Sequence, residues 1–188
     1  MRHDVEALRV TLKVCLATIL LIAAVSSISC GRSSRGKELE TWEIGNNAFK
    51  VRITAFAEKK GGLVAGAYYV FQAAQSGANG WHEIMTFRHD DPVPIPREQV
   101  RFVQDRIGFV FMGWMYAITT DGGRTWSVWD ALRELPNWKC CNYVLIRDVR
   151  IGLDGSGTMS LNPIPDRRGE VPELCTKDYG RHWAAVCP

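Results

Sequence analysis

The chain has 188 residues, of which 46% are hydrophobic and 23% are charged. This balance is ordinary for a globular protein and excludes a largely disordered or fibrous chain. The formal charge is only +3, with the basic residues dispersed, so nothing favours a nucleic-acid partner. At about 100–200 residues per domain, one compact domain is expected.

The N-terminal segment is typical of a secretory signal. Residues 14–25 form an uncharged apolar run, basic residues at positions 2, 9 and 13 precede it, and serines follow it. The run is shorter than the roughly 20 residues that span a bilayer as a helix. The sequence therefore predicts a signal peptide over residues 1–29.

The end of this segment resembles a bacterial lipobox, because Cys30 directly follows Ser27, Ile28 and Ser29. Ser27 departs from the leucine that is usual at its position, and plain cleavage or a retained anchor stays open. The resemblance implies lipid modification of Cys30, and the absence of aspartate after it implies sorting to the outer membrane. Residues 30–39 are small and charged, which predicts a flexible tether. Residues 40–188 are expected to form a single β domain.

Short runs rich in β-forming residues, separated by glycine-rich turns, follow along the rest of the chain. This pattern indicates an all-β protein. One helix is expected, over residues 127–135, because Pro136 would end it. The expected strands cover residues 50–56, 64–71, 81–87, 100–103, 108–111, 115–119, 125–129, 143–151, 158–161, 173–176 and 183–186.

Two stretches 57 residues apart share the pattern T-x-D-x-G-R-x-W, at residues 119–126 and 176–183. The aspartate carboxylate is expected to accept backbone N–H groups within a turn, and the glycine permits a positive φ. Residues 76–81 form a degenerate third copy without the aspartate. The residues with expected folding roles are Thr119, Asp121, Gly123, Thr125, Trp126, Thr176, Asp178, Gly180 and Trp183.

These two stretches resemble the Asp-box, or BNR repeat, of sialidase-like β-propellers. There the box joins the third and fourth strands of a blade and stabilises it. About a dozen strands would form three four-stranded antiparallel sheets, whereas closed propellers typically have four to eight blades. We therefore expect a short propeller-like stack of about three sheets with Asp-box hairpins.

Four cysteines remain after Cys15 in the signal and Cys30: Cys140, Cys141, Cys175 and Cys187. An even number in an exported chain favours disulfides, and four allow three connectivities. The favoured arrangement connects the Cys140–Cys141 loop to the C-terminal hairpin. A zinc site is the alternative, although no C-x-x-C pair is present.

Motifs for catalysis or for metal and cofactor binding are incomplete. His82-Glu83 begins like H-E-x-x-H but the fifth residue is Thr86. Residues 31–37 match the start of a phosphate-binding loop without its strand and helix context, and residues 155–157 lack the nucleophile-elbow spacing. We expect no enzyme activity, cofactor or metal.

The C-terminal stretch, with Val149–Ile151, residues 154–159 and the second box, resembles immunity lipoproteins that protect bacteria against type VI secretion lipase effectors. The resemblance is strongest over residues 97–188. It implies a periplasm-facing, lipid-anchored protein whose partner is a cognate phospholipase. Alternatives are a carbohydrate-binding module, an assembly or scaffold factor, or a remnant glycosidase. Trp114, Trp129 and Trp138 are candidate partner contacts, because interfaces favour aromatic anchors.

Overall fold

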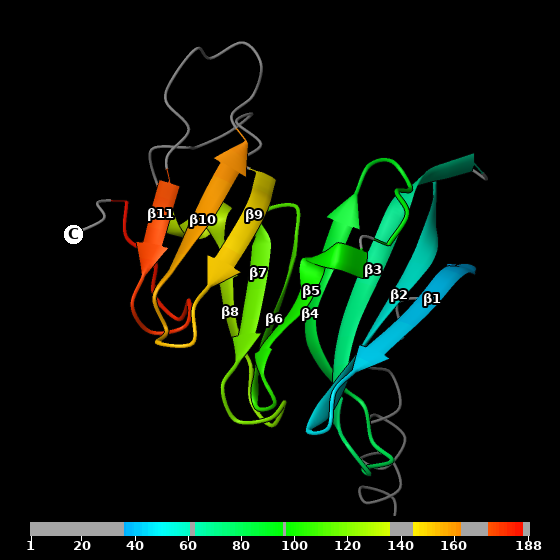
Figure 1. The fold of residues 1–188 in the computed structure, drawn as a ribbon. Helices are drawn as coiled ribbons and strands as arrows, with labels where there is room; N and C mark the ends of the chain where they lie inside the picture. The colour runs from blue at the N-terminus through cyan, green and yellow to red at the C-terminus, as the bar shows by residue number, and fades with distance from the viewer. Residues whose placement is uncertain (1–35, 61–62, 96, 136–144, 163–172, 186–188) are drawn as a thin grey trace, which may run out of the picture. The chain divides into compact units, whose positions relative to one another are not determined.

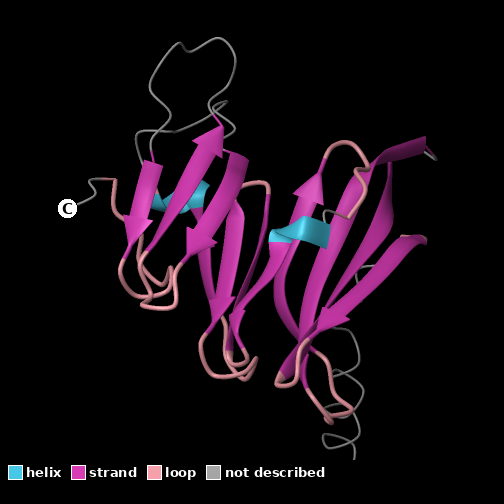
Figure 2. Cartoon of the chain, viewed as in Figure 1, coloured by secondary structure: helices cyan, strands magenta, loops and turns pink. Residues whose placement is uncertain are grey.

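The computed structural model describes residues 36–60, 63–95, 97–135, 145–162 and 173–185. Residues 36–188 form one compact unit. The described residues of this unit make three antiparallel sheets, accompanied by one short α-helix and one 3₁₀ turn (Figures 1 and 2). The chain is all-β, as the sequence predicts, and the described residues form no closed propeller.

Each sheet is a meander in which every strand pairs with its neighbour in sequence. Sheet 1 contains β1 (Glu38–Gly45), β2 (Phe49–Lys60), β3 (Leu63–Gln75) and β4 (His82–His89). After η2 (Arg97–Gln99), sheet 2 contains β5 (Val100–Gln104), β6 (Ile107–Met112), β7 (Met115–Thr119) and β8 (Ser127–Asp130), followed by α2 (Ala131–Glu134). Sheet 3 contains β9 (Leu145–Ile151), β10 (Gly157–Asn162) and β11 (Glu173–Thr176).

The first ten predicted strands overlap β2 to β11 in order. Strand β1 was not predicted, and it begins two residues inside the predicted tether. Its only large apolar side chains on the inward face are Trp42 and Ile44, between exposed polar residues. The expected strand at 183–186 is reduced, within the described residues, to an isolated bridge between Cys175 and Ala184. Sheet 3 therefore has three strands and not four.

The helix predicted over residues 127–135 is wrong in its first half. Residues 127–130 pair with β7 as strand β8, and only Ala131–Glu134 is helical. The carboxylate of Asp130 caps this helix by accepting the Leu132 N–H at 2.9 Å. The sequence also predicted a strand over residues 125–129, which overlapped this helix, and the pairing with β7 shows that the strand is the correct assignment for residues 127–129.

Sheet 2 lies between the other sheets and contributes to two hydrophobic cores. Strand β6, with the sequence IGFVFM, is buried at every position. Its alternate residues Val110 and Met112 pack with sheet 1, whereas Phe109 and Phe111 pack with sheet 3. A strand buried on both faces needs a continuous apolar run, and β6 has one.

The outer face of sheet 3 is polar, and that of sheet 1 is mixed, with Val70 among its apolar residues. In sheet 3, Met159 and Leu161 face sheet 2, so the alternate residues Thr158 and Ser160 face outward. In sheet 1, ion pairs cross the outer face, such as Arg52 with Glu43 at 2.6 Å. Polar outer faces let the first and last units of a repeat array end in water.

The two-sided core makes sheet 2 the most sensitive to truncation. Phe111 is 1% exposed, so Phe111→Ala should lower the free energy of unfolding by about 3–5 kcal/mol because it leaves a cavity. Val128 on β8 is 46% exposed, and Val128→Ala should change it by less than about 1 kcal/mol. Urea unfolding followed by tryptophan fluorescence measures both; equal losses would contradict this assignment of the core.

Candidate functional site

The first of the two repeated stretches, residues 119–126 and called the first box below, connects β7 to β8 and is closed by hydrogen bonds to one carboxylate. Asp121 Oδ1 accepts the Thr119 hydroxyl at 2.9 Å and the N–H groups of Arg124 and Thr125 at 3.0 Å each. Its Oδ2 accepts the Thr125 hydroxyl at 2.6 Å. The Thr119 hydroxyl in turn accepts the Gly123 N–H at 3.0 Å. The side chains of Asp121 and Thr119 thus stabilise the turn through hydrogen bonds within it.

These bonds stabilise the charged form of Asp121. Partial burial of the carboxyl acts to raise its pKa. Hydrogen bonds from the side chain and N–H of Thr125, from the Thr119 hydroxyl and from the Arg124 N–H outweigh burial and lower the pKa from 3.8 to about 2.

The second box repeats this network after β11. The Thr176 hydroxyl donates to Asp178 Oδ1 at 2.8 Å and accepts the Gly180 N–H at 2.9 Å. His182 replaces Thr125, with its N–H donating to Asp178 Oδ1 at 3.0 Å and its Nδ1 lying 2.5 Å from Oδ2. Burial raises the pKa of Asp178, but the bonds from His182 and Thr176 lower it on balance.

The strands that precede the boxes are also equivalent. Thr119 pairs with Gly108 across β7 and β6, and Thr176 pairs with Gly157 across β11 and β10. The repeated pattern seen in the sequence therefore corresponds to the same register in sheets 2 and 3.

Each box tryptophan packs edge-on against an aromatic ring of the preceding sheet. The Trp126 ring meets Phe49 at 5.8 Å between centroids, and Trp183 meets Tyr116 at 5.5 Å. A methyl group on Gly123, whose φ is +79°, would lie 2.7 Å from the Phe49 Cβ. Glycine is required there by both space and conformation. The boxes therefore connect one sheet to the next.

The turn at residues 76–81 occupies the same place between β3 and β4 but lacks the carboxylate network. The Ser76 N–H donates to the Ala48 carbonyl of the β1–β2 turn at 2.9 Å. Trp81 lies beneath the Arg52 guanidinium, 3.9 Å from its ring centroid. It is a structural counterpart of the boxes, and not a functional third box.

The box turns also bond to the first turn of their own sheet. The Gly122 N–H donates to the Arg106 carbonyl, and the Tyr179 N–H to the Gly155 carbonyl, at 2.9 Å in both cases. Gly122 has φ +74°, and Tyr179 has φ +62° at the equivalent position. A non-glycine residue with left-handed backbone angles costs roughly 1–2 kcal/mol, so other contacts must offset this cost at Tyr179.

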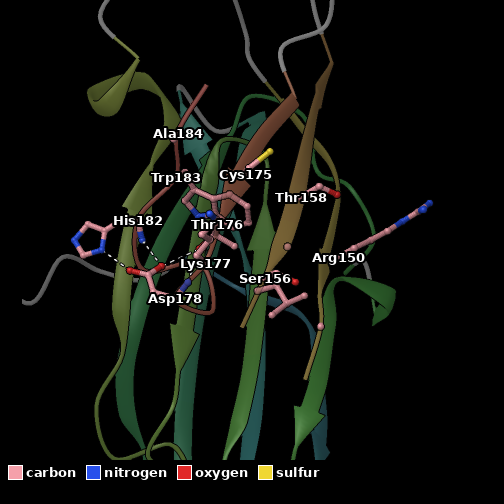
Figure 3. A pocket seen from close by; sticks show the side chains of 13 residues that line it. Arg150, Ser156, Thr158, Cys175, Thr176, Lys177, Asp178, His182, Trp183 and Ala184 are labelled. Carbon is pink, nitrogen blue, oxygen red and sulfur yellow. Dashed lines mark hydrogen bonds and ion pairs between the residues drawn. The ribbon is translucent and has the colours of Figure 1, made fainter. Parts of the chain in front are cut away.

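The described residues include one sizeable groove, of about 1000 Å³, and it lies at the second box (Figure 3). Small side chains such as Ser156, Thr158 and Ala184 line it, with Arg150 and Lys177 among its longer ones. Arg150, Thr158 and Cys175 lie in register across β9, β10 and β11, on the face away from sheet 2. The sequence analysis missed this groove because it depends on strand register.

The Asp178–His182 pair superficially resembles an acid–base dyad. Its position matches Asp121 with Thr125, a pair that can only accept and donate hydrogen bonds within a turn. The equivalence supports a folding role for Asp178. Over the described ranges, no group of three or more metal-ligating side chains comes together.

Trp114 and Trp129, two of the candidate partner contacts, are half-buried between sheets. The Trp114 ring meets Phe87 at 4.7 Å, and Trp129 meets Trp183 at 6.5 Å. Both therefore contribute to packing, and their contact with a partner stays a prediction.

Cys175 is disulfide-bonded. Cys140, Cys141, Cys187, Trp138, Cys30 and the signal segment lie outside the described residues. In the part of the chain that the structure describes, no helix has the length and apolar character to cross a membrane. Comparisons with protein-family models, curated proteins and solved structures find no significant match.

The Asp121 network predicts a pH effect on stability. Since folding lowers the pKa of this carboxyl to about 2, its contribution is complete above about pH 4 and is lost as the pH falls towards 2. Asp121→Asn should cost about 1–3 kcal/mol at pH 7, because charged acceptors form the stronger bonds. The wild type should lose about 1 kcal/mol of its free energy of unfolding between about pH 4 and pH 2 through this carboxyl, and the variant should not. This figure already allows for solvent screening.

The measurement is urea unfolding from pH 2 to 7. Asp105→Asn is the matched control, because Asp105 is exposed and is in the turn next to the box. An identical pH profile for the wild type and Asp121→Asn would contradict the prediction.

Proposed function

We propose that this chain is an exported lipoprotein that binds and neutralises a phospholipase effector delivered by type VI secretion, without catalysis of its own. The signal-like N-terminus and the C-terminal resemblance support export and this class of partner. A protein of this kind needs a rigid surface with complementary groups, and it needs no reaction centre.

The observation that carries the proposal is the groove on the outer face of sheet 3. Among the described residues, sheet 2 packs against the inner face, and the outer face carries the groove. Arg150 and Lys177 are exposed, whereas mostly apolar surface, with Ile151, Trp183 and Ala184 among its residues, lines the groove. Interfaces of this type combine a compact floor with a charged rim.

The surface is also held in place. Asp148 accepts Arg101 of sheet 2 at 2.8 Å and Arg150 at 2.9 Å. The Arg101 guanidinium also donates to the Val149 carbonyl at 2.6 Å. Arg181 donates to the Thr120 hydroxyl of the first box. A surface ordered before binding loses less conformational entropy in the complex.

Binding of sugars is less favoured by the same structure. Stacking on a sugar needs an open ring face, but every described tryptophan is at least partly buried. Trp81 is covered by Arg52, and Trp126 and Trp183 pack against rings of the preceding sheets. The groove is therefore better matched to a protein.

The direct test asks first whether a gene next to that for this chain encodes a phospholipase, and then uses that enzyme. The purified mature protein should inhibit hydrolysis of phospholipid vesicles at a near-stoichiometric ratio, and the two proteins should elute together in size-exclusion chromatography. Full lipase activity at tenfold excess of this chain would contradict the proposal.

The anchor is tested separately in bacteria. Cys30→Ser should move the protein from the membrane fraction to the soluble periplasmic fraction, because it removes the thiol that would carry the lipid. Cys15→Ser is the matched control and should leave it with the membrane. Membrane association of Cys30→Ser would show that another feature anchors the chain.

A further inference from the structure

A row of three residues, one on each of the first three strands, recurs in sheets 2 and 3 at the same register relative to the boxes. The rows are Arg101, Phe109 and Ile118 in sheet 2, and Arg150, Thr158 and Cys175 in sheet 3 (Figure 3). Sheet 3 covers the row of sheet 2, whereas the row of sheet 3 lines the groove. The covered row therefore shows how an occupant of the groove would be seated.

Sheet 3 covers the row of sheet 2 with an apolar face. Val149, Met159 and Leu174 lie in register across its three strands and pack in one core with Phe109 and Ile118. All five side chains are buried. The face that this row accepts is thus that of an antiparallel sheet with bulky apolar side chains.

The arginine of the covered row contacts acceptors at the edge of the sheet that covers it. The Arg101 guanidinium lies 2.8 Å from the Asp148 carboxylate and donates to the Val149 carbonyl at 2.6 Å. Arg150 has the equivalent position, and its side chain is 82% exposed although it pairs with Asp148 of its own strand. An occupant seated in the same way would offer Arg150 a carboxylate and a backbone carbonyl.

The two rows differ in side-chain size. The groove has Thr158 where the covered row has Phe109. The smaller side chain leaves room on the face of sheet 3 for bulky apolar groups of an occupant. The apolar lining beside it, with Trp183 and Ala184, suits such groups.

The two boxes also differ in charge. The Thr120 hydroxyl of the first box accepts a hydrogen bond from Arg181 of the second box. The second box has the exposed Lys177 in the place of Thr120. Asp178 lines the groove as well, but both of its oxygens are engaged within the box. Lys177 would therefore repel a further unit with an arginine at this place and attract a carboxylate.

We infer that the groove seats an antiparallel β-hairpin of the partner, with bulky apolar side chains towards Thr158 and carboxylates beside Arg150 and Lys177. The inference rests on the proposed function, and the partner is the effector proposed there. The apolar contact in the groove supplies most of the binding energy, and the two cations select an acidic partner.

Filling the groove tests the seat. With the phospholipase encoded beside this gene, Thr158→Phe should raise the dissociation constant at least about 30-fold, because the ring would occupy the space of the partner's side chains. Thr86→Phe, on the outer face of sheet 1, is the matched control and should stay within about threefold. Calorimetric titration measures both, and urea unfolding checks that the variants keep the wild-type midpoint.

Reversing the charge at the groove tests the acidity of the partner without changing the apolar lining. Lys177→Glu should weaken binding roughly 10-fold at low ionic strength and less at high, since salt screens exposed charges. Arg147→Glu is the matched control, because Arg147 is exposed on β9 but does not line the groove. Equal effects of the two substitutions would overturn the charge assignment.

Carbodiimide coupling identifies the occupant directly, because it joins a lysine amine as an amide to a carboxylate in contact with it. In the complex, Lys177 should couple to an aspartate or glutamate on a β-hairpin of the phospholipase, found by mass spectrometry of the cross-linked peptides. Coupling to a helix, or no coupling at Lys177, would overturn the hairpin as the occupant.

The outcomes separate the two proposals. If the wild type binds and inhibits but Thr158→Phe does so equally well, this inference is wrong and the proposed function stands. If no phospholipase is encoded beside this gene, or if the wild type does not bind it, the proposed function is wrong and the inference fails with it.

Discussion

The arrangement of the sheets depends on a carboxylate enclosed by a turn. In both boxes, one aspartate accepts hydrogen bonds from residues before and after the bend, so the chain reverses tightly at the end of the third strand. The reversal brings the following tryptophan against an aromatic ring of the preceding sheet. A short-range polar network thus sets a long-range apolar contact, which explains why the same residues recur with the same spacing.

The faces of the sheets determine how far the stack extends. Sheet 2 is apolar on both sides, whereas the outer residues of sheet 3, such as Thr158 and Ser160, are polar. A further sheet packed there would remove these hydroxyl groups and the exposed Arg150–Asp148 ion pair from water, at a cost in desolvation. The same polarity leaves the groove beside the second box available, so the end of the stack and the candidate site are one surface.

The repeated box and the β-rich runs were visible in the sequence because both are local patterns. Strand β1 was not visible in the sequence, because it has few apolar residues. It is a strand because it pairs with β2, and this pairing is not a local pattern. The groove and the inward and outward faces of sheet 3 depend on register between strands that the spacing of residues does not specify. Tyr179 was readable as a tyrosine where the first box has glycine, but its bond to Leu153 was not, because it connects turns 26 residues apart.

The reduced edge of sheet 3 has a consequence for how the domain opens. Sheets 1 and 2 each have a complete fourth strand, but among the described residues Ala184 pairs with β11 through only two hydrogen bonds, to Cys175. Local unfolding starts where few backbone bonds and little apolar area must be lost. Among the hydrogen-bonded amides of the described residues, exchange should therefore be faster at Ala184 than in β6, and the disulfide at Cys175 lies where a covalent restraint limits such opening.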